Sequence, residues 1–107
     1  MTKEFTQDNF NTDVIEASNS KPVLVDFFAS WCGPCQMQAP IVAELAESLA
    51  DKAVIGELNT ENAMDITRQF GIMSIPTIMI FRNGQPVERF TGVQDKETLM
   101  ASLEKNV

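Results

Sequence analysis

The chain contains two cysteines, and only two residues separate them. Cys32 and Cys35 lie in the segment WCGPC, which occupies residues 31–35. Cysteines at this spacing can form a structural disulfide, contribute two ligands to a metal site, or act as a redox-active dithiol. The chemistry open to the pair therefore depends on the loop that it closes and on the elements that surround it.

A purely structural disulfide and a metal site both fit this pair poorly. Two residues at positions i and i+3 of a helical turn have Cα atoms about 5 Å apart, which suits a disulfide. Closing so short a loop gains only roughly 2 kcal/mol from restriction of the unfolded chain. A zinc site usually needs four cysteine or histidine ligands, and the chain has two cysteines and no histidine. We therefore favour a dithiol that exchanges with other disulfides.

The flanking elements explain how such a dithiol would be activated. The segment PVLVDFFA, residues 22–29, is apolar on both faces and predicts a buried strand, and Pro34 suits the first turn of a following helix. Cys32 would then lie at the helix N-terminus, where free backbone N–H groups and the helix dipole stabilise a thiolate. We expect Cys32 to be the outer, attacking thiol and Cys35, inside the first turn, to be the more shielded resolving thiol.

Periodic apolar residues predict helices on either side of this segment. The expected helical faces carry Phe10, Val14 and Ile15 near the N-terminus, Met37, Ile41, Leu45 and Leu49 after the cysteines (with a kink at Pro40), and Leu99, Met100, Leu103 and Val107 at the C-terminus. A further helix is expected over residues 60–71, capped by Thr60 and ended by Gly71.

Strands alternate with these helices. A short strand is expected before Phe10, another over residues 53–59, and a hairpin after residue 76 that turns at Asn83–Gly84. Pro86 places the last strand at a sheet edge, since proline lacks a backbone donor. The order predicts an α/β fold, with a βαβαβ half followed by a ββα half and helices on both faces of a mixed sheet.

Composition narrows the class of protein. A length of 107 residues predicts one domain over residues 1–107, and 44% hydrophobic with 21% charged residues is ordinary globular usage. The net charge is −7 and the eight basic residues are scattered, which argues against nucleic acid or an anionic membrane as partners. Two cysteines without a hydrophobic leader favour a reducing compartment, so we expect a cytoplasmic protein.

The sequence around the cysteines resembles a known family. The run VDFFASWCGPC at residues 25–35, with Asp26 six positions before Cys32, is similar to the active-site segment of the thioredoxin family. The resemblance extends to SIPT at residues 74–77, to FRNG at residues 81–84 and to Gly92, in family order and spacing across nearly the whole chain.

The resemblance implies a thioredoxin fold, in which four helices flank a mixed five-stranded sheet. It implies that Cys32 attacks a protein disulfide, that Cys35 resolves the mixed disulfide, and that buried Asp26 assists deprotonation of Cys35, with no bound cofactor beyond the Cys32–Cys35 disulfide. The implied partners are disulfide-containing proteins and an NADPH-dependent thioredoxin reductase, and the implied state is a monomer.

The resemblance also implies a substrate-binding surface. A cis peptide bond between Ile75 and Pro76 would turn the Ile75 backbone toward a substrate chain. The apolar surface around Cys32 would consist of Trp31, Gly33, Pro34, Ile75, Pro76, Gly92 and Val93.

Three positions depart from the common family pattern. Phe28 stands where many members have a second tryptophan, Gln36 replaces a frequent basic residue, and Glu57 stands where many members have a lysine near the buried aspartate. Glu57 would raise the pKa of a neighbouring carboxylate and disfavour a nearby thiolate, if its side chain does not point to solvent.

Two other functions stay open at this point. An oxidase or isomerase would use the same fold, although Gly33 and Pro34 between the cysteines resemble the reducing members. A non-catalytic binding module would use the same apolar surface without needing its thiols.

Overall fold

A five-stranded mixed sheet forms the centre of the molecule. The computed structural model describes residues 2–107. The strands lie in the order β1-β3-β2-β4-β5, and β1, β3 and β2 are parallel whereas β4 and β5 are antiparallel to their neighbours. Their bounds are β1 Lys3–Phe5, β2 Val23–Phe28, β3 Val54–Asn59, β4 Thr77–Arg82 and β5 Gln85–Thr91. The predicted mixed five-stranded sheet is confirmed.

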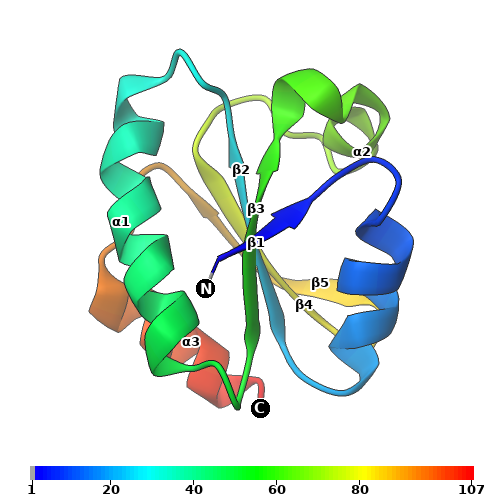
Figure 1. Cartoon of the computed structure of the whole chain (residues 1–107), viewed down its shortest axis with the longest axis vertical. Coiled ribbons are helices and arrows are strands. Elements are labelled where there is room, and N and C mark those ends of the chain that lie inside the picture. Colours follow the sequence, from blue (N-terminus) through cyan, green and yellow to red (C-terminus); the bar gives the residue numbers. More distant parts are fainter. Residues whose placement is uncertain (1) are drawn as a thin grey trace.

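Helical segments cover both faces of this sheet. Figure 1 shows α1 and α3 on one side and the N-terminal helical segment with α2 on the other. The helical segments are η1 Asn11–Glu16, η2 Ala17–Asn19, α1 Gly33–Ser48, η3 Thr60–Asn62, α2 Met64–Gln69 and α3 Lys96–Lys105. No helix within residues 2–107 is long and apolar enough to cross a membrane.

Alternation along β2 divides the core into two clusters. Val23, Val25 and Phe27 are buried in the cluster on the side of η1 and α2. Leu24 is buried in the cluster formed with α1 and α3. Because side chains alternate along a strand, Asp26 points to the same face as Leu24, under helix α1. The strand that precedes the cysteines therefore places one carboxylate beneath the helix that carries them.

The N-terminal helix differs from the expected regular α-helix. It consists of a π-helix, η1, followed by a 3₁₀ turn, η2, although Phe10 and Val14 are buried as predicted. The wider turn is seen at Ala17, whose N–H donates to the carbonyl oxygen of Thr12, five residues earlier, and also to that of Val14, where the chain tightens. The burial pattern was thus predicted, and the type of helix was not.

The apolar face of α1 also differs from the expected one. Met37 is 66% exposed, so its prediction as a core residue is wrong, whereas the polar Gln38 is fully buried. Leu45 and Leu49 are buried and Ile41 packs against their cluster, as expected. Cys35, Gln38, Val42 and Leu45 are buried at steps of three or four residues. This helical repeat turns Gln38, and not Met37, toward the sheet.

The predicted helix over residues 60–71 is divided at Ala63. This residue has φ −144° and ψ 57°, so η3 and α2 are separate segments. Thr60 does not cap a helix: its hydroxyl donates to the Phe28 carbonyl oxygen at 3.0 Å, while the Asn59 side chain accepts from Glu61 N–H at 2.9 Å. Gly71 ends the helical region with φ +63°, as predicted.

The hairpin has the predicted turn and edge strand. Asn83 and Gly84 have φ values of 56° and 82°, which a type I′ turn requires. Strand β5, with Pro86, lies at the sheet edge, and the pairing with β4 is irregular between Ile80 and Phe81.

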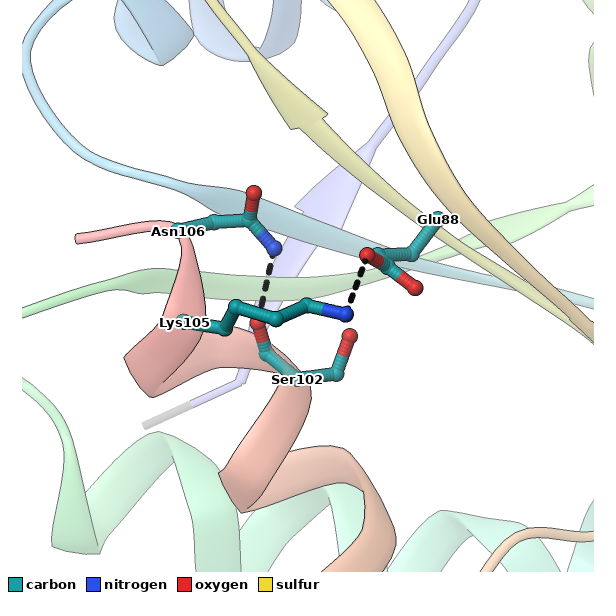
Figure 2. Close-up of polar contacts among 4 residues, drawn as sticks. All are labelled: Glu88, Ser102, Lys105 and Asn106. Atoms are coloured by element: carbon teal, nitrogen blue, oxygen red, sulfur yellow. Dashed lines mark hydrogen bonds and ion pairs between the residues drawn. The ribbon is translucent and has the colours of Figure 1, made fainter.

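The C-terminal helix is anchored to β5. Lys105 Nζ lies 3.0 Å from Glu88 Oε2, and Asn106 Nδ2 donates to the Ser102 carbonyl oxygen at 2.8 Å (Figure 2). Leu99 and Leu103 are buried, but Val107 lies beyond α3 and is 64% exposed, so its expected place on the apolar face is wrong. The Ser102 hydroxyl is buried and has no hydrogen-bond partner among the described atoms.

Candidate active site

The two cysteines form a disulfide at the beginning of α1. Cys32 is the N-cap residue, with extended φ and ψ of −92° and 116°, and Cys35 lies in the first turn. Their Cα atoms are 5.2 Å apart, close to the separation expected from helical geometry. Pro34 occupies the start of the helix, where its missing N–H costs no helical hydrogen bond. The local sequence thus places both sulfur atoms at the positive end of a 16-residue helix.

Hydrogen bonds distinguish the two sulfur atoms, but exposure does not. Each cysteine is 4% exposed, so the expectation that Cys32 is the more exposed of the two is wrong. The Cys35 N–H donates to Cys32 Sγ at 3.2 Å, and this sulfur lies 3.8 Å from the Ile75 carbonyl oxygen. A donor aimed at Cys32 Sγ stabilises negative charge on that atom, so the backbone favours Cys32 as the thiolate.

Asp26 is a buried carboxylate without a hydrogen-bond partner. It is 1% exposed, and neither carboxylate oxygen has a partner among the described atoms. Burial first, and the nearby charge of Glu57 second, raise the pKa of Asp26 from its ordinary value of 3.8 to about 7. A group that titrates near neutral pH can both accept and donate a proton.

Glu57 faces the same side of the sheet and reaches a pocket next to Cys35. It lies opposite Asp26 in the pairing of β2 with β3. A pocket of about 210 Å³ is lined by Phe28, Ala29, Ser30, Cys35, Gln36, Ala39 and Glu57. Burial and the neighbouring Glu4 raise the pKa of Glu57. Glu57 is half-buried and lines this pocket together with Cys35, so its side chain does not extend freely into solvent.

Among the expected surface residues, Ile75 packs against the disulfide. Phe28 and Ile75 pack against the small cluster of Ala29, Cys32 and Cys35. The Ile75–Pro76 peptide bond is cis, and the Pro76 carbonyl oxygen accepts a hydrogen bond from Gly92 N–H at 2.9 Å. The end of β2 and the segment at Ile75 therefore meet at the cysteine pair, and Gly92 is hydrogen-bonded to that second segment.

The other expected surface residues differ in exposure. Trp31 is 72% exposed and Val93 is 39% exposed, which leaves both side chains available to a partner. Gly33 and Pro34 are exposed between the cysteines, Gly92 is half-buried, and Pro76 is buried. Pro76 has no N–H and its carbonyl oxygen is paired with Gly92, so it can act only by fixing the backbone of the neighbouring Ile75.

Sequence reasoning missed Gln38 and Gln94. The fully buried Gln38 side chain donates to the Gln94 carbonyl oxygen at 3.0 Å and accepts from Gln94 N–H at 2.8 Å. A polar residue three positions after Cys35, on the buried face of an apolar helix, is the signal that could have identified this contact.

Comparison with known proteins agrees with this geometry. The family model described as Thioredoxin matches residues 1–105. The chain belongs to the thioredoxin family. Members of this family are protein-disulfide oxidoreductases, and the Cys32–Cys35 pair gives this chain the dithiol–disulfide couple on which that activity depends.

Individual thioredoxins are similar over most of their length. A thioredoxin from Alicyclobacillus acidocaldarius is 48% identical over 95% of this chain and 94% of its own. Thioredoxin 1 from Synechococcus elongatus is 44% identical over the same shares of the two chains. A protein from Mycobacterium leprae named bifunctional thioredoxin reductase/thioredoxin is 41% identical over 96% of this chain, which corresponds to 22% of that longer protein.

Proposed function

We propose that this thioredoxin reduces disulfides in other proteins, with Cys32 as the attacking thiol and Cys35 as the resolving thiol. The observation that carries the proposal is the hydrogen bond from Cys35 N–H to Cys32 Sγ at the start of α1. It stabilises a thiolate on Cys32 at the position where the helix dipole also favours negative charge.

The reaction consists of two thiol–disulfide exchanges. The Cys32 thiolate attacks one sulfur of the substrate disulfide, forming a mixed disulfide and releasing the other substrate sulfur as a thiolate. The Cys35 thiolate then attacks Cys32 Sγ, which forms the Cys32–Cys35 disulfide and releases the second substrate sulfur. Two electrons pass to the substrate, and two protons are taken up by its thiolates.

Asp26 supplies the proton transfer that the second exchange needs. Cys35 must lose its proton to attack, and a carboxylate beneath α1 with a pKa of about 7 is suited to accept it. Within residues 2–107 no side chain or backbone group is hydrogen-bonded to the two carboxylate oxygens, which supports their use in this step. Asp26 is thus proposed as a proton acceptor acting on Cys35, directly or through water.

Substrate binding is assigned to the surface around Cys32. The proposed residues are Trp31, Gly33, Pro34, Ile75, Pro76, Gly92 and Val93. The Ile75 carbonyl oxygen lies 3.8 Å from Cys32 Sγ, which supports a role for the Ile75 backbone in pairing with an extended substrate chain. The exposed Trp31 and Val93 side chains offer apolar contact.

The proposed cycle needs an external reductant. The Cys32–Cys35 disulfide would be reopened by a flavin-containing, NADPH-dependent thioredoxin reductase, a partner that the fused relative from M. leprae supports. The protein would act as a monomer in the cytoplasm, where such a reductant is present. Disulfide-containing proteins are its proposed substrates, with neither nucleic acid nor membrane as a partner.

A trapping experiment tests this function. Cys35→Ser removes the resolving thiol, so mixed disulfides on Cys32 should accumulate and survive non-reducing electrophoresis, whereas the Cys32→Ser, Cys35→Ser double variant should retain none. Failure to trap any protein from the native host would contradict the reductase role. Cys32→Ser should also lose insulin reduction. A binding module that does not need its thiols would keep its function in this variant.

The oxidase or isomerase alternative is distinguished by the redox equilibrium. A reductase should stay mostly oxidised until the glutathione buffer is strongly reducing, whereas an oxidase should be reduced in a mildly reducing buffer. Quantifying the free thiols across a series of such buffers decides between the two.

A further inference from the structure

The connection between β5 and α3 is held against α1 by a buried glutamine. Gln38 is fully buried, and its carboxamide makes both possible hydrogen bonds to the backbone of Gln94, at 3.0 Å and 2.8 Å. The two residues are 56 positions apart in the sequence. Because water does not reach the Gln38 side chain, no solvent molecule can take over these bonds without local opening.

The same connection is tied to the segment beside the cysteines. Gly92 N–H donates to the Pro76 carbonyl oxygen at 2.9 Å, and the preceding residue, Ile75, has its carbonyl oxygen 3.8 Å from Cys32 Sγ. The Gln94 side chain closes the turn locally by donating to the Gly92 carbonyl oxygen at 3.3 Å. A series of hydrogen bonds thus leads from Gln38, through residues 94 and 92, to Pro76.

These contacts connect α1, the 92–94 loop and the segment at Ile75, all of which lie next to the disulfide or one helical turn from it. Gln38 lies one helical turn after Cys35 on the buried face of α1, so it is fixed relative to that cysteine. At the other end, Ile75 packs against both cysteines. The spacing between the helix that carries the thiols and the loop that carries Val93 is therefore set by the Gln38 carboxamide.

We propose that Gln38 is a positioning residue, which holds residues 92–94 against α1 so that this loop can contact disulfide-bearing polypeptide substrates. The inference rests on the proposed function, since it concerns the substrate-binding surface of the same site. The hydrogen bonds of the Gln38 side chain are to the backbone of Gln94, so its effect on the surface around Cys32 is indirect. It therefore affects recognition of a polypeptide and leaves the thiol chemistry itself unchanged.

The first test separates recognition from chemistry. Gln38→Met keeps the size of the side chain and removes both hydrogen bonds, and Gln38→Leu is a second apolar variant. We expect the KM for insulin reduction to rise about tenfold with little change in kcat, because two buried hydrogen bonds are lost. Reduction of a small aromatic disulfide (dithiobis-nitrobenzoate) and the equilibrium with glutathione should change less than about twofold. Gln69→Met, an exposed glutamine at the end of α2, is the matched control and should match the parent in all three measurements.

The second test observes the loop without any activity. Amide hydrogen exchange at Gln94 should accelerate about tenfold or more in Gln38→Met, while exchange in β2 stays as in the parent. Gln38→Glu keeps an acceptor for Gln94 N–H but buries a carboxylate against the Gln94 carbonyl oxygen, so it should not restore the parent KM or the parent exchange rate.

In the activity test, the inference would be overturned by an unchanged KM for insulin in folded Gln38→Met, or by an equal loss with the small disulfide. Unchanged exchange at Gln94 would also refute it. A parent protein that fails to reduce insulin would refute the proposed function instead, and the exchange experiment would still report on the loop.

Discussion

Asp26 and Glu57 lie directly opposite each other on the parallel strands β2 and β3, with Glu4 next in line on β1. Side chains at paired positions of a sheet point to the same face, so three carboxylates form a row across three strands. Asp26, the innermost of them, is 1% exposed. The pKa values of Asp26 and Glu57 are both raised, because burial and like charge act in the same direction on each.

The raised pKa of Asp26 predicts that the protein becomes less stable as pH rises toward neutrality. The folded-state pKa, about 7, is above the ordinary value of 3.8, so between these pH values the folded protein holds a proton that the unfolded chain has lost. The free energy of unfolding should therefore fall across this window, by on the order of 4 kcal/mol from this group alone. Urea unfolding of the parent and of Asp26→Asn between pH 4 and pH 8 measures the effect. The variant should show a flatter dependence, whereas Asp8→Asn, which removes an exposed carboxylate, should keep the parent's slope.

Replacement of Glu57 by lysine should shift the thiol chemistry to lower pH. The change puts a positive charge opposite Asp26 and next to the pocket that reaches Cys35, which favours both the ionised carboxylate and a thiolate. Alkylation of Cys32 in the reduced protein, followed against pH, should have its midpoint lowered by about half a unit or more in Glu57→Lys. Glu47→Lys, an exposed change of equal charge on α1, is the control. Superimposable curves for the parent and Glu57→Lys would mean that Glu57 does not influence the site.

The sequence predicted most of the elements that carry the site, because their signals are local. Alternation and turn residues located the strands and the hairpin at Asn83–Gly84, and the cysteine spacing located the start of α1. The division at Ala63 was missed because residues 60–71 have a continuous helical pattern, and only the tertiary contact of Thr60 with Phe28 shows that the chain turns there.

Polar residues in the core were the least predictable part. From the sequence, Met37 is expected in the core and Gln38 at the surface. In the structure Gln38 is buried and Met37 is exposed, because the Gln38 side chain is hydrogen-bonded to a backbone partner 56 residues away. The equal burial of the two cysteines was also missed, since exposure depends on Ile75, which follows them by about 40 positions. Contacts between distant segments, rather than local patterns, set these features.

Gly56 should not tolerate a side chain. A methyl group on its Cα would lie 2.8 Å from the Lys3 carbonyl oxygen and would overlap the Phe5 ring, both on β1. Because β1 is held mainly by its pairing with β3, Gly56→Ala should lower the free energy of unfolding by about 1–3 kcal/mol. Thermal or urea unfolding measures the change. Gly33→Ala is the matched control for stability, since a methyl group there meets nothing within 4 Å, and an equal loss in both variants would contradict the steric explanation.

Removal of the Ser102 hydroxyl should stabilise the protein. Its oxygen is buried between α3 and β5 and finds no hydrogen-bond partner within residues 2–107, although the Lys105–Glu88 ion pair is close by (Figure 2). A buried polar atom without a partner has lost its hydration and gained nothing in return, so Ser102→Ala should raise the free energy of unfolding by about 1–2 kcal/mol. Alanine also favours a helix over serine by about half a kcal/mol, and Ser48→Ala at the exposed end of α1 measures that contribution separately. A gain in Ser102→Ala no greater than that in Ser48→Ala would show that the Ser102 hydroxyl is hydrogen-bonded in solution.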